Sequence, residues 1–173
     1  MKRCNNLVDA GRRQFLQGGA MATAGVAAAV MVPTQAKAAT AKARVEYPSN
    51  RLGNISDLVE NEPFDVSYPD EDAPGVLLKL GAAVQGGAGP ASDIVGFTTV
   101  CPHKGYPLNY SDSDRSFSCP GHYSRFDPEA GGQQIHGQAT SNLPQYILRI
   151  DAKGDIYAEG IDELLYGRLS NTL

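Results

Sequence analysis

Short apolar runs separated by turn residues fill the middle of the chain. Phe64 to Tyr68 alternates apolar and polar residues, a pattern typical of a half-buried strand. Six further runs are rich in β-branched, aromatic or other apolar residues and are bounded by Gly, Pro, Asp or Asn. They are Gly75–Leu80, Ile94–Val100, Phe117–Cys119, Ser124–Asp127, Tyr146–Ile150 and Ile156–Ala158. No helix-long periodicity appears between residues 62 and 160, so the pattern predicts an all-β fold.

The ends of this region have a different character. Residues 39–62 are mixed and polar, and we expect them to form an N-terminal arm. The turn Lys153-Gly154-Asp155 joins the last two runs into a predicted hairpin. Residues 161–173 read as a C-terminal tail, with one or two helical turns over Ile161 to Arg168. The globular part, residues 63–160, is therefore expected to be a small antiparallel sandwich or barrel.

Residues 1–38 read as a targeting segment. A basic start precedes a small-residue apolar run, Gly18 to Val32, and Ala36-Lys37-Ala38 offers a cleavage site. Arg12-Arg13-Gln14-Phe15-Leu16 resembles a twin-arginine signal, which predicts export of a folded protein to the periplasm. The alternative is a general secretory signal with an incidental arginine pair. The apolar run is shorter than the ~20 residues that span a bilayer, so we expect membrane attachment only if the leader is retained as an anchor.

Removal of the leader changes the charge of the protein. The mature chain keeps 10 of the 15 Lys and Arg residues and 18 of the 19 Asp and Glu residues. Such an acidic balance disfavours nucleic acid and anionic membranes as partners and suits a partner with a basic face. Of the three cysteines, Cys4 lies in the leader, so the mature chain has two.

Those two cysteines belong to a pair of matched motifs, Cys101-Pro-His103 and Cys119-Pro-Gly-His122, separated by residues 104–118. Thiolates and imidazoles at this spacing indicate zinc or iron–sulfur. Zinc sites usually use a Cys pair followed by a His pair, or four Cys. One Cys and one His in each motif suits a [2Fe–2S] cluster with two thiolates on one iron and two imidazoles on the other. A structural zinc site and a plain disulfide with incidental histidines are the alternatives. His136 has no Cys at ligand spacing and is expected to be an ordinary loop residue.

The pattern C-x-H-x15-C-x-x-H resembles the Rieske family over roughly residues 64–160. The resemblance implies that Cys101 and Cys119 bind one iron and that His103 and His122 bind the other. It also implies a two-loop cluster-binding subdomain, residues 97–128, with the loops at hairpin tips. Many Rieske proteins have a disulfide between these loops, and this chain has Tyr106 and Gly121 at those positions.

The same resemblance suggests roles around the cluster. Ser124 matches a serine that donates a hydrogen bond to a bridging sulfide. Phe126 stands where relatives have a tyrosine that donates to a cysteine sulfur, and it cannot donate. The loop from Gly137 to Pro144 is similar to a segment that shields the cluster.

The residues around the ligands, CPHKGYPLNY, SCPGHYSRFDPEAGG and GQATSNLPQY, resemble the small subunits of arsenite oxidases. This resemblance implies a non-catalytic electron-transfer subunit with one [2Fe–2S] cluster. Its partners would be a large molybdopterin and [3Fe–4S] catalytic subunit and, as acceptor, a cytochrome c or a small copper protein. The Rieske subunit of a quinol-oxidising complex, a soluble ferredoxin feeding an aromatic dioxygenase and a zinc-stabilised binding module are the alternatives. The missing cysteine pair disfavours the first, and export disfavours the second.

Overall fold

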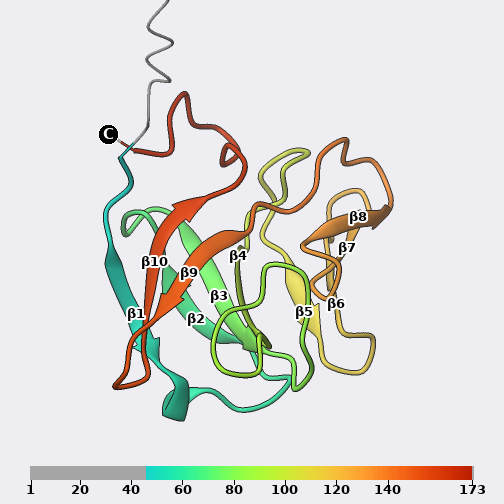
Figure 1. Cartoon of the computed structure of the whole chain (residues 1–173). Coiled ribbons are helices and arrows are strands. Elements are labelled where there is room, and N and C mark those ends of the chain that lie inside the picture. Colours follow the sequence, from blue (N-terminus) through green and yellow to red (C-terminus); the bar gives the residue numbers. More distant parts are fainter. Residues whose placement is uncertain (1–45, 173) are drawn as a thin grey trace, which may run out of the picture. The chain divides into compact units, whose positions relative to one another are not determined.

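The computed structural model describes residues 46–172 (Figure 1). The predicted leader, residues 1–38, and the first part of the predicted arm lie outside the described residues. Within them, three antiparallel sheets and one short 3-10 helix form the fold, which confirms the predicted all-β class. The elements are β1 (Asn50–Asn54), η1 (Ile55–Asp57), β2 (Phe64–Ser67), β3 (Pro74–Lys79), β4 (Ile94–Thr98), β5 (Asn109–Ser111), β6 (Ser116–Ser118), β7 (Arg125–Asp127), β8 (Gln133–His136), β9 (Tyr146–Ile150) and β10 (Asp155–Ile161). Between residues 46 and 172, no helix is long and apolar enough to cross a membrane.

Two three-stranded sheets, β1-β10-β9 and β2-β3-β4, build the body of the protein. Strand β4 is buried along its whole length, which explains its continuous apolar sequence. A bridge between Phe97 and Gln145 joins β4 to the start of β9. Two clusters of buried side chains fill this body. One contains Tyr68 and Tyr146, and the other contains Leu77 and Ile156.

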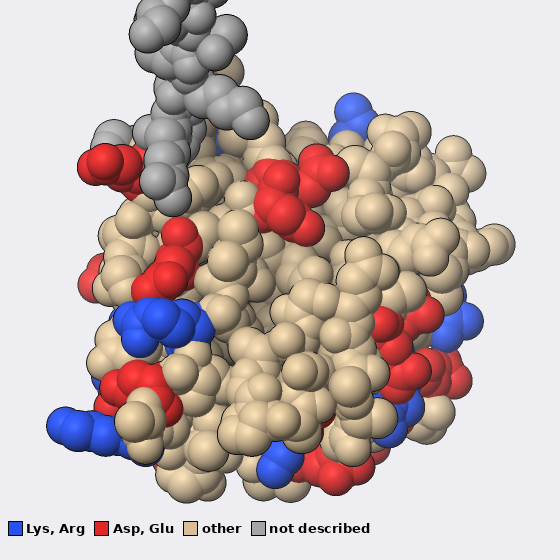
Figure 2. Space-filling view, viewed as in Figure 1, with Lys and Arg blue, Asp and Glu red and all other residues tan. Residues whose placement is uncertain are grey.

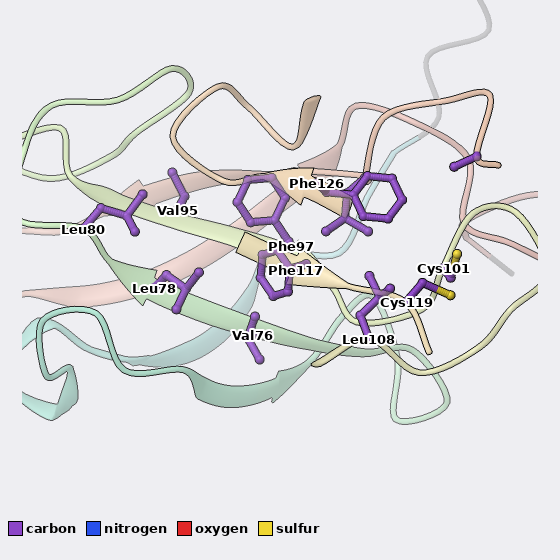
Figure 3. Packing of buried hydrophobic residues seen from close by; sticks show 12 residues of the cluster. Val76, Leu78, Leu80, Val95, Phe97, Cys101, Leu108, Phe117, Cys119 and Phe126 are labelled. Atoms are coloured by element: carbon purple, nitrogen blue, oxygen red, sulfur yellow. The ribbon is translucent and has the colours of Figure 1, made fainter. Parts of the chain in front are cut away.

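A third sheet, β5-β6-β7-β8, carries the two motif loops and lies to the right of the body in Figure 1. A separate apolar cluster connects it to β3 and β4 (Figure 3). In this cluster the rings of Phe97 and Phe117 meet edge to face, with their centroids 5.8 Å apart. The cluster continues to Cys101 and Cys119, so the packed core ends at the two thiols.

The structure differs from the sequence-based expectation at both ends of the domain. Residues 50–54, expected in the arm, form β1 and pair with β10. A register shift between Arg51 and Gly53 interrupts the alternation of side chains, which is why the sequence shows no strand pattern there. The helical turns expected from Ile161 onward are also not observed. β10 extends to Ile161, and the backbone N–H of Leu165 donates to the side chain of Asn171 instead of to a helical carbonyl.

Candidate metal centre

The two Cys–His motifs form loops of the same design. One loop lies between β4 and β5 and the other between β6 and β7. In the first loop the N–H of Gly105 donates to the carbonyl of Cys101 at 2.8 Å, and in the second the N–H of Tyr123 donates to the carbonyl of Cys119 at 3.1 Å. Each bond closes an α-turn of five residues. The last residue of each turn has positive φ, 71° at Gly105 and 60° at Tyr123. Each loop therefore places its cysteine and histidine within one tight turn.

Cys101 and Cys119 lie side by side at the base of the loops, both buried and both free (Figure 3). Burial raises the pKa of the Cys101 thiol above its ordinary value, and the neighbouring Cys119 raises it further. The buried Cys101 thiol therefore resists ionisation unless a cation offsets its negative charge. Two free, adjacent thiols are an arrangement that fits ligands of iron.

The two imidazoles form a second pair beyond the thiols. The rings of His103 and His122 lie with their centroids 4.8 Å apart at an interplanar angle of 76°. Nδ1 of His103 is buried and has no hydrogen-bond partner. An unpaired buried nitrogen costs about 1–3 kcal/mol, a cost that a bond to a metal would remove. No three His, Cys, Asp or Glu side chains among residues 46–172 converge as one metal ion would require. A sulfur pair beside an imidazole pair matches the ligands of two irons.

His136 has a different position from the two paired histidines. It ends β8, faces Arg125 across the ladder and is exposed. Together with Cys119 and Tyr123 it lines an open surface pocket of about 500 Å³. The sequence placed His136 in a loop, whereas the structure places it in a strand.

Tyr106 joins the two loops at the position where many Rieske proteins have a disulfide. Its ring covers Gly121 so closely that a Cβ atom there would lie 2.8 Å from Cδ2 of the tyrosine. The same ring meets His122 edge to face, with centroids 5.9 Å apart and planes at 89°. A noncovalent aromatic contact therefore connects the loops, and it needs a glycine at position 121.

Ser124 holds a third loop, residues 137–145 after β8, against the site. Its hydroxyl oxygen is fully buried and accepts hydrogen bonds from the backbone N–H groups of Gln138, at 3.1 Å, and Ala139, at 2.9 Å. The segment after β8 is thereby held against the second motif loop. The sequence indicated Ser124 as a donor but not as an acceptor, because its partners follow it by fourteen and fifteen residues. The hydroxyl hydrogen is left to donate to the cluster, and that expectation stays a prediction.

Replacing Ser124 with alanine should lower the reduction potential of the cluster and the stability of the domain. A hydrogen bond to a sulfide favours the reduced state, which carries more negative charge, so its loss should shift the potential down by some tens of millivolts, since 1 kcal/mol is ~43 mV for one electron. The N–H groups of Gln138 and Ala139 also lose their acceptor, and the loss at the buried Ala139 should cost about 1–3 kcal/mol. Protein-film voltammetry and thermal unfolding measure the two effects.

Ser141→Ala is the matched control, because Ser141 is an exposed serine in the same third loop. It should leave both quantities unchanged. An unaltered potential in Ser124→Ala with the cluster intact would show that Ser124 is not a donor to the cluster.

The loops around the paired ligands carry almost no charge. In residues 101–110, 119–124 and 137–145 the single charged side chain is Lys104. Figure 2 agrees, because residues other than Lys, Arg, Asp and Glu cover most of its upper right, where Figure 1 places the loop after β8. An otherwise acidic protein thus has loops with a single charged residue at the candidate site.

Comparison with known proteins gives four informative matches. Residues 50–147 match the family model described as the Rieske [2Fe-2S] domain. The chain is 40% identical over 164 residues to the iodate reductase subunit IdrB of Denitromonas iodatirespirans, covering 92% of this chain and 85% of that protein. It is 38% identical to the subunit of the same name from Pseudomonas sp. (strain SCT), covering 90% and 81% of the two chains. Among solved structures, the soluble domain of the Rieske protein II from Sulfolobus acidocaldarius matches with a TM-score of 0.59 and 25% identity, covering 66% of this chain and 78% of that one.

Proposed function

Because the chain belongs to the Rieske [2Fe–2S] domain family and carries one Rieske-type cluster, we propose that Cys101 and Cys119 bind one iron and that His103 and His122 bind the other. The observation that carries this assignment is the separation of a buried sulfur pair from an imidazole pair at the outer end of the loops. When bound, such a cluster supplies one-electron chemistry at roughly −150 to +300 mV, because neutral imidazoles replace two thiolates. The two motif loops hold the four ligands, and the apolar core beneath the thiols excludes water from their side.

We propose further that the chain is the electron-transfer subunit of an exported oxidoreductase whose large subunit holds a molybdopterin site and a [3Fe–4S] cluster. The relatives that match along most of their length are subunits by name, and the ligand loops resemble those of arsenite oxidase small subunits. The low charge of these loops supports a lasting contact with a large subunit, because charged residues are depleted at the centres of interfaces. A cytochrome c or small copper protein would exchange electrons with the complex.

Iodate reduction is the activity that the comparisons favour for the complex, since two iodate reductase subunits match at least 90% of this chain. In that reaction the electrons would pass through this chain toward the large subunit. The residues between the ligands favour a second candidate, arsenite oxidation, in which the electrons would leave the large subunit through this chain.

Co-expression with the gene of a large molybdopterin oxidoreductase subunit from the same organism tests the proposal. The purified complex is assayed for iodate reduction with a reduced dye and for arsenite oxidation with cytochrome c. We expect iodate reduction, and we expect its loss when the small subunit carries His103→Ala. Arsenite oxidation without iodate reduction would select the second candidate. A large subunit that does not co-purify would contradict the subunit role.

Export should depend on the arginine pair of the leader. The double variant Arg12→Lys with Arg13→Lys should retain the precursor in the cytoplasm, because the twin-arginine pathway reads this pair. Cell fractionation followed by immunoblotting measures the distribution. The matched control, Arg3→Lys, changes one arginine of the basic start outside the motif and should be exported normally. Periplasmic accumulation of the double variant would exclude the twin-arginine route.

A further inference from the structure

The segment after β10, residues 162–172, is fixed to the body of the protein at several points. Leu165 is buried in the cluster that contains Tyr68 and Tyr146. The side chain of Asn171, 4% exposed, accepts from the N–H of Leu165 at 2.8 Å and donates to the carbonyl of Glu163 at 2.7 Å. The chain therefore folds back on itself, and its course is determined although it contains no helix or strand.

Two further contacts fasten this segment to distant parts of the chain. Asn171 Nδ2 donates to the hydroxyl of Tyr47 at 2.9 Å. The guanidinium of Arg168 binds both carboxylate oxygens of Asp70, at 2.5 and 2.7 Å, and bidentate pairs of this kind have a fixed geometry. Figure 1 shows the segment passing over the upper end of the body and returning toward the start of the described chain.

Between these anchors, Tyr166 lies against the first motif loop. A Cβ atom on Gly105 would lie 2.6 Å from Cε1 and 2.7 Å from Cδ1 of the Tyr166 ring, so the ring covers the glycine directly. Gly105 closes the turn that contains Cys101 and His103, through its N–H bond to the Cys101 carbonyl. The ring therefore contacts the turn that presents one candidate ligand to each iron.

This contact continues the link between the two loops. Tyr106, the next residue after Gly105, packs on Gly121 of the second loop and meets His122 edge to face. Tyr166 thus supports the first loop from outside, and Tyr106 connects the first loop to the second. In a pair of loops without a disulfide, these two rings help to fix the relative positions of the ligands.

We propose that Tyr166 is a positioning residue for the cluster. Residues 162–172 would then be a structural part of the site, packed against the first motif loop, and not a free tail. The inference rests on the ligand assignment proposed above. The ring restrains the turn at Gly105 and keeps water from the first loop. Loss of the ring would let water approach, and water stabilises the more negative reduced state, which raises the reduction potential.

The test compares Tyr166→Ala, Tyr166→Phe and Leu169→Ala in the full holoprotein. Leu169 lies in the same segment and is fully exposed, so its replacement controls for changes in the segment itself. We expect Tyr166→Ala to speed amide exchange of the peptide spanning residues 101–106 by about tenfold, with β9 and β10 unchanged. We also expect a positive shift of the reduction potential. Tyr166→Phe keeps the ring. Both Tyr166→Phe and the control Leu169→Ala should match the parent protein in amide exchange and in reduction potential.

Unchanged exchange and potential in Tyr166→Ala would overturn the proposal. Faster exchange in β9 and β10 as well as in the loop would show a general structural role and would also overturn it. If Tyr166→Ala does not accumulate, Tyr166→Leu should give an intermediate effect on exchange in the first loop, and a parental value would count against the proposal. Absence of a Rieske signal from the parent protein would instead refute the ligand assignment.

Discussion

Replacing His103 or His122 with alanine is expected to remove the [2Fe–2S] cluster from the purified protein. Each imidazole is one of only two protein ligands that we assign to the outer iron, and alanine offers no replacement. The rings lie 4.8 Å apart, so the loss of one leaves the other with half of a binding site. Iron and acid-labile sulfide contents should fall to near zero, and the visible absorption should disappear.

His136→Ala is the matched control, because it makes the same substitution at an exposed histidine at the end of β8. It should retain a full cluster. Cluster loss in His136→Ala, or full retention in His103→Ala, would contradict the ligand assignment.

Replacing Gly137 with alanine is expected to destabilise the domain strongly. Gly137 has φ of +95°, which favours glycine, and a Cβ atom would lie 2.4 Å from the Cα and 2.6 Å from the N of Ser124. Positive φ costs an L-residue roughly 1–2 kcal/mol, and a collision with backbone cannot be relieved by rotating a side chain. We expect a loss of about 3 kcal/mol or more in the free energy of unfolding. Thermal and denaturant unfolding measure this loss.

Gly167→Ala separates the two causes of that loss. Gly167 also has positive φ, +81°, but a Cβ atom there would meet nothing within 4 Å. It should cost only the conformational part, about 1 kcal/mol. Equal losses in the two variants would mean that the third loop does not pack on Ser124 as closely as the structure indicates.

Local sequence was sufficient to indicate the all-β fold and the paired motifs. In β4 the apolar residues are contiguous, and in each motif the cysteine and histidine share one turn, so the chemistry can be recognised from neighbouring residues. The separation of the thiol pair from the imidazole pair, however, depends on how β4 and β6 pack, and only the structure shows it.

Features that depend on distant partners were not predictable in the same way. β1 pairs with β10 from the other end of the domain, and β5 and β8 are short polar strands defined by their neighbours and not by hydrophobicity. The contact of Tyr166 with Gly105 likewise joins segments that the sequence gives no reason to bring together. For Ser124 the resemblance placed the loop from Gly137 to Pro144 near the cluster but did not indicate the two bonds that Ser124 accepts from this loop. The segment after Ile161 was expected to be a tail because its anchors, Asp70 and Tyr47, lie far away in the chain.

The most direct test of the central claim is pulsed EPR on the reduced protein with ¹⁵N-labelled histidine. Two nitrogen ligands on one iron should give a signal of low average g and two strongly coupled ¹⁵N nuclei. In any His103→Ala or His122→Ala protein that retains a reducible cluster, one of the two couplings should vanish and the average g should rise, while His136→Ala should preserve both couplings. A protein that contains stoichiometric zinc and gives no signal, or a [2Fe–2S] signal without strong nitrogen coupling, would contradict the claim that these two cysteines and two histidines hold a Rieske cluster.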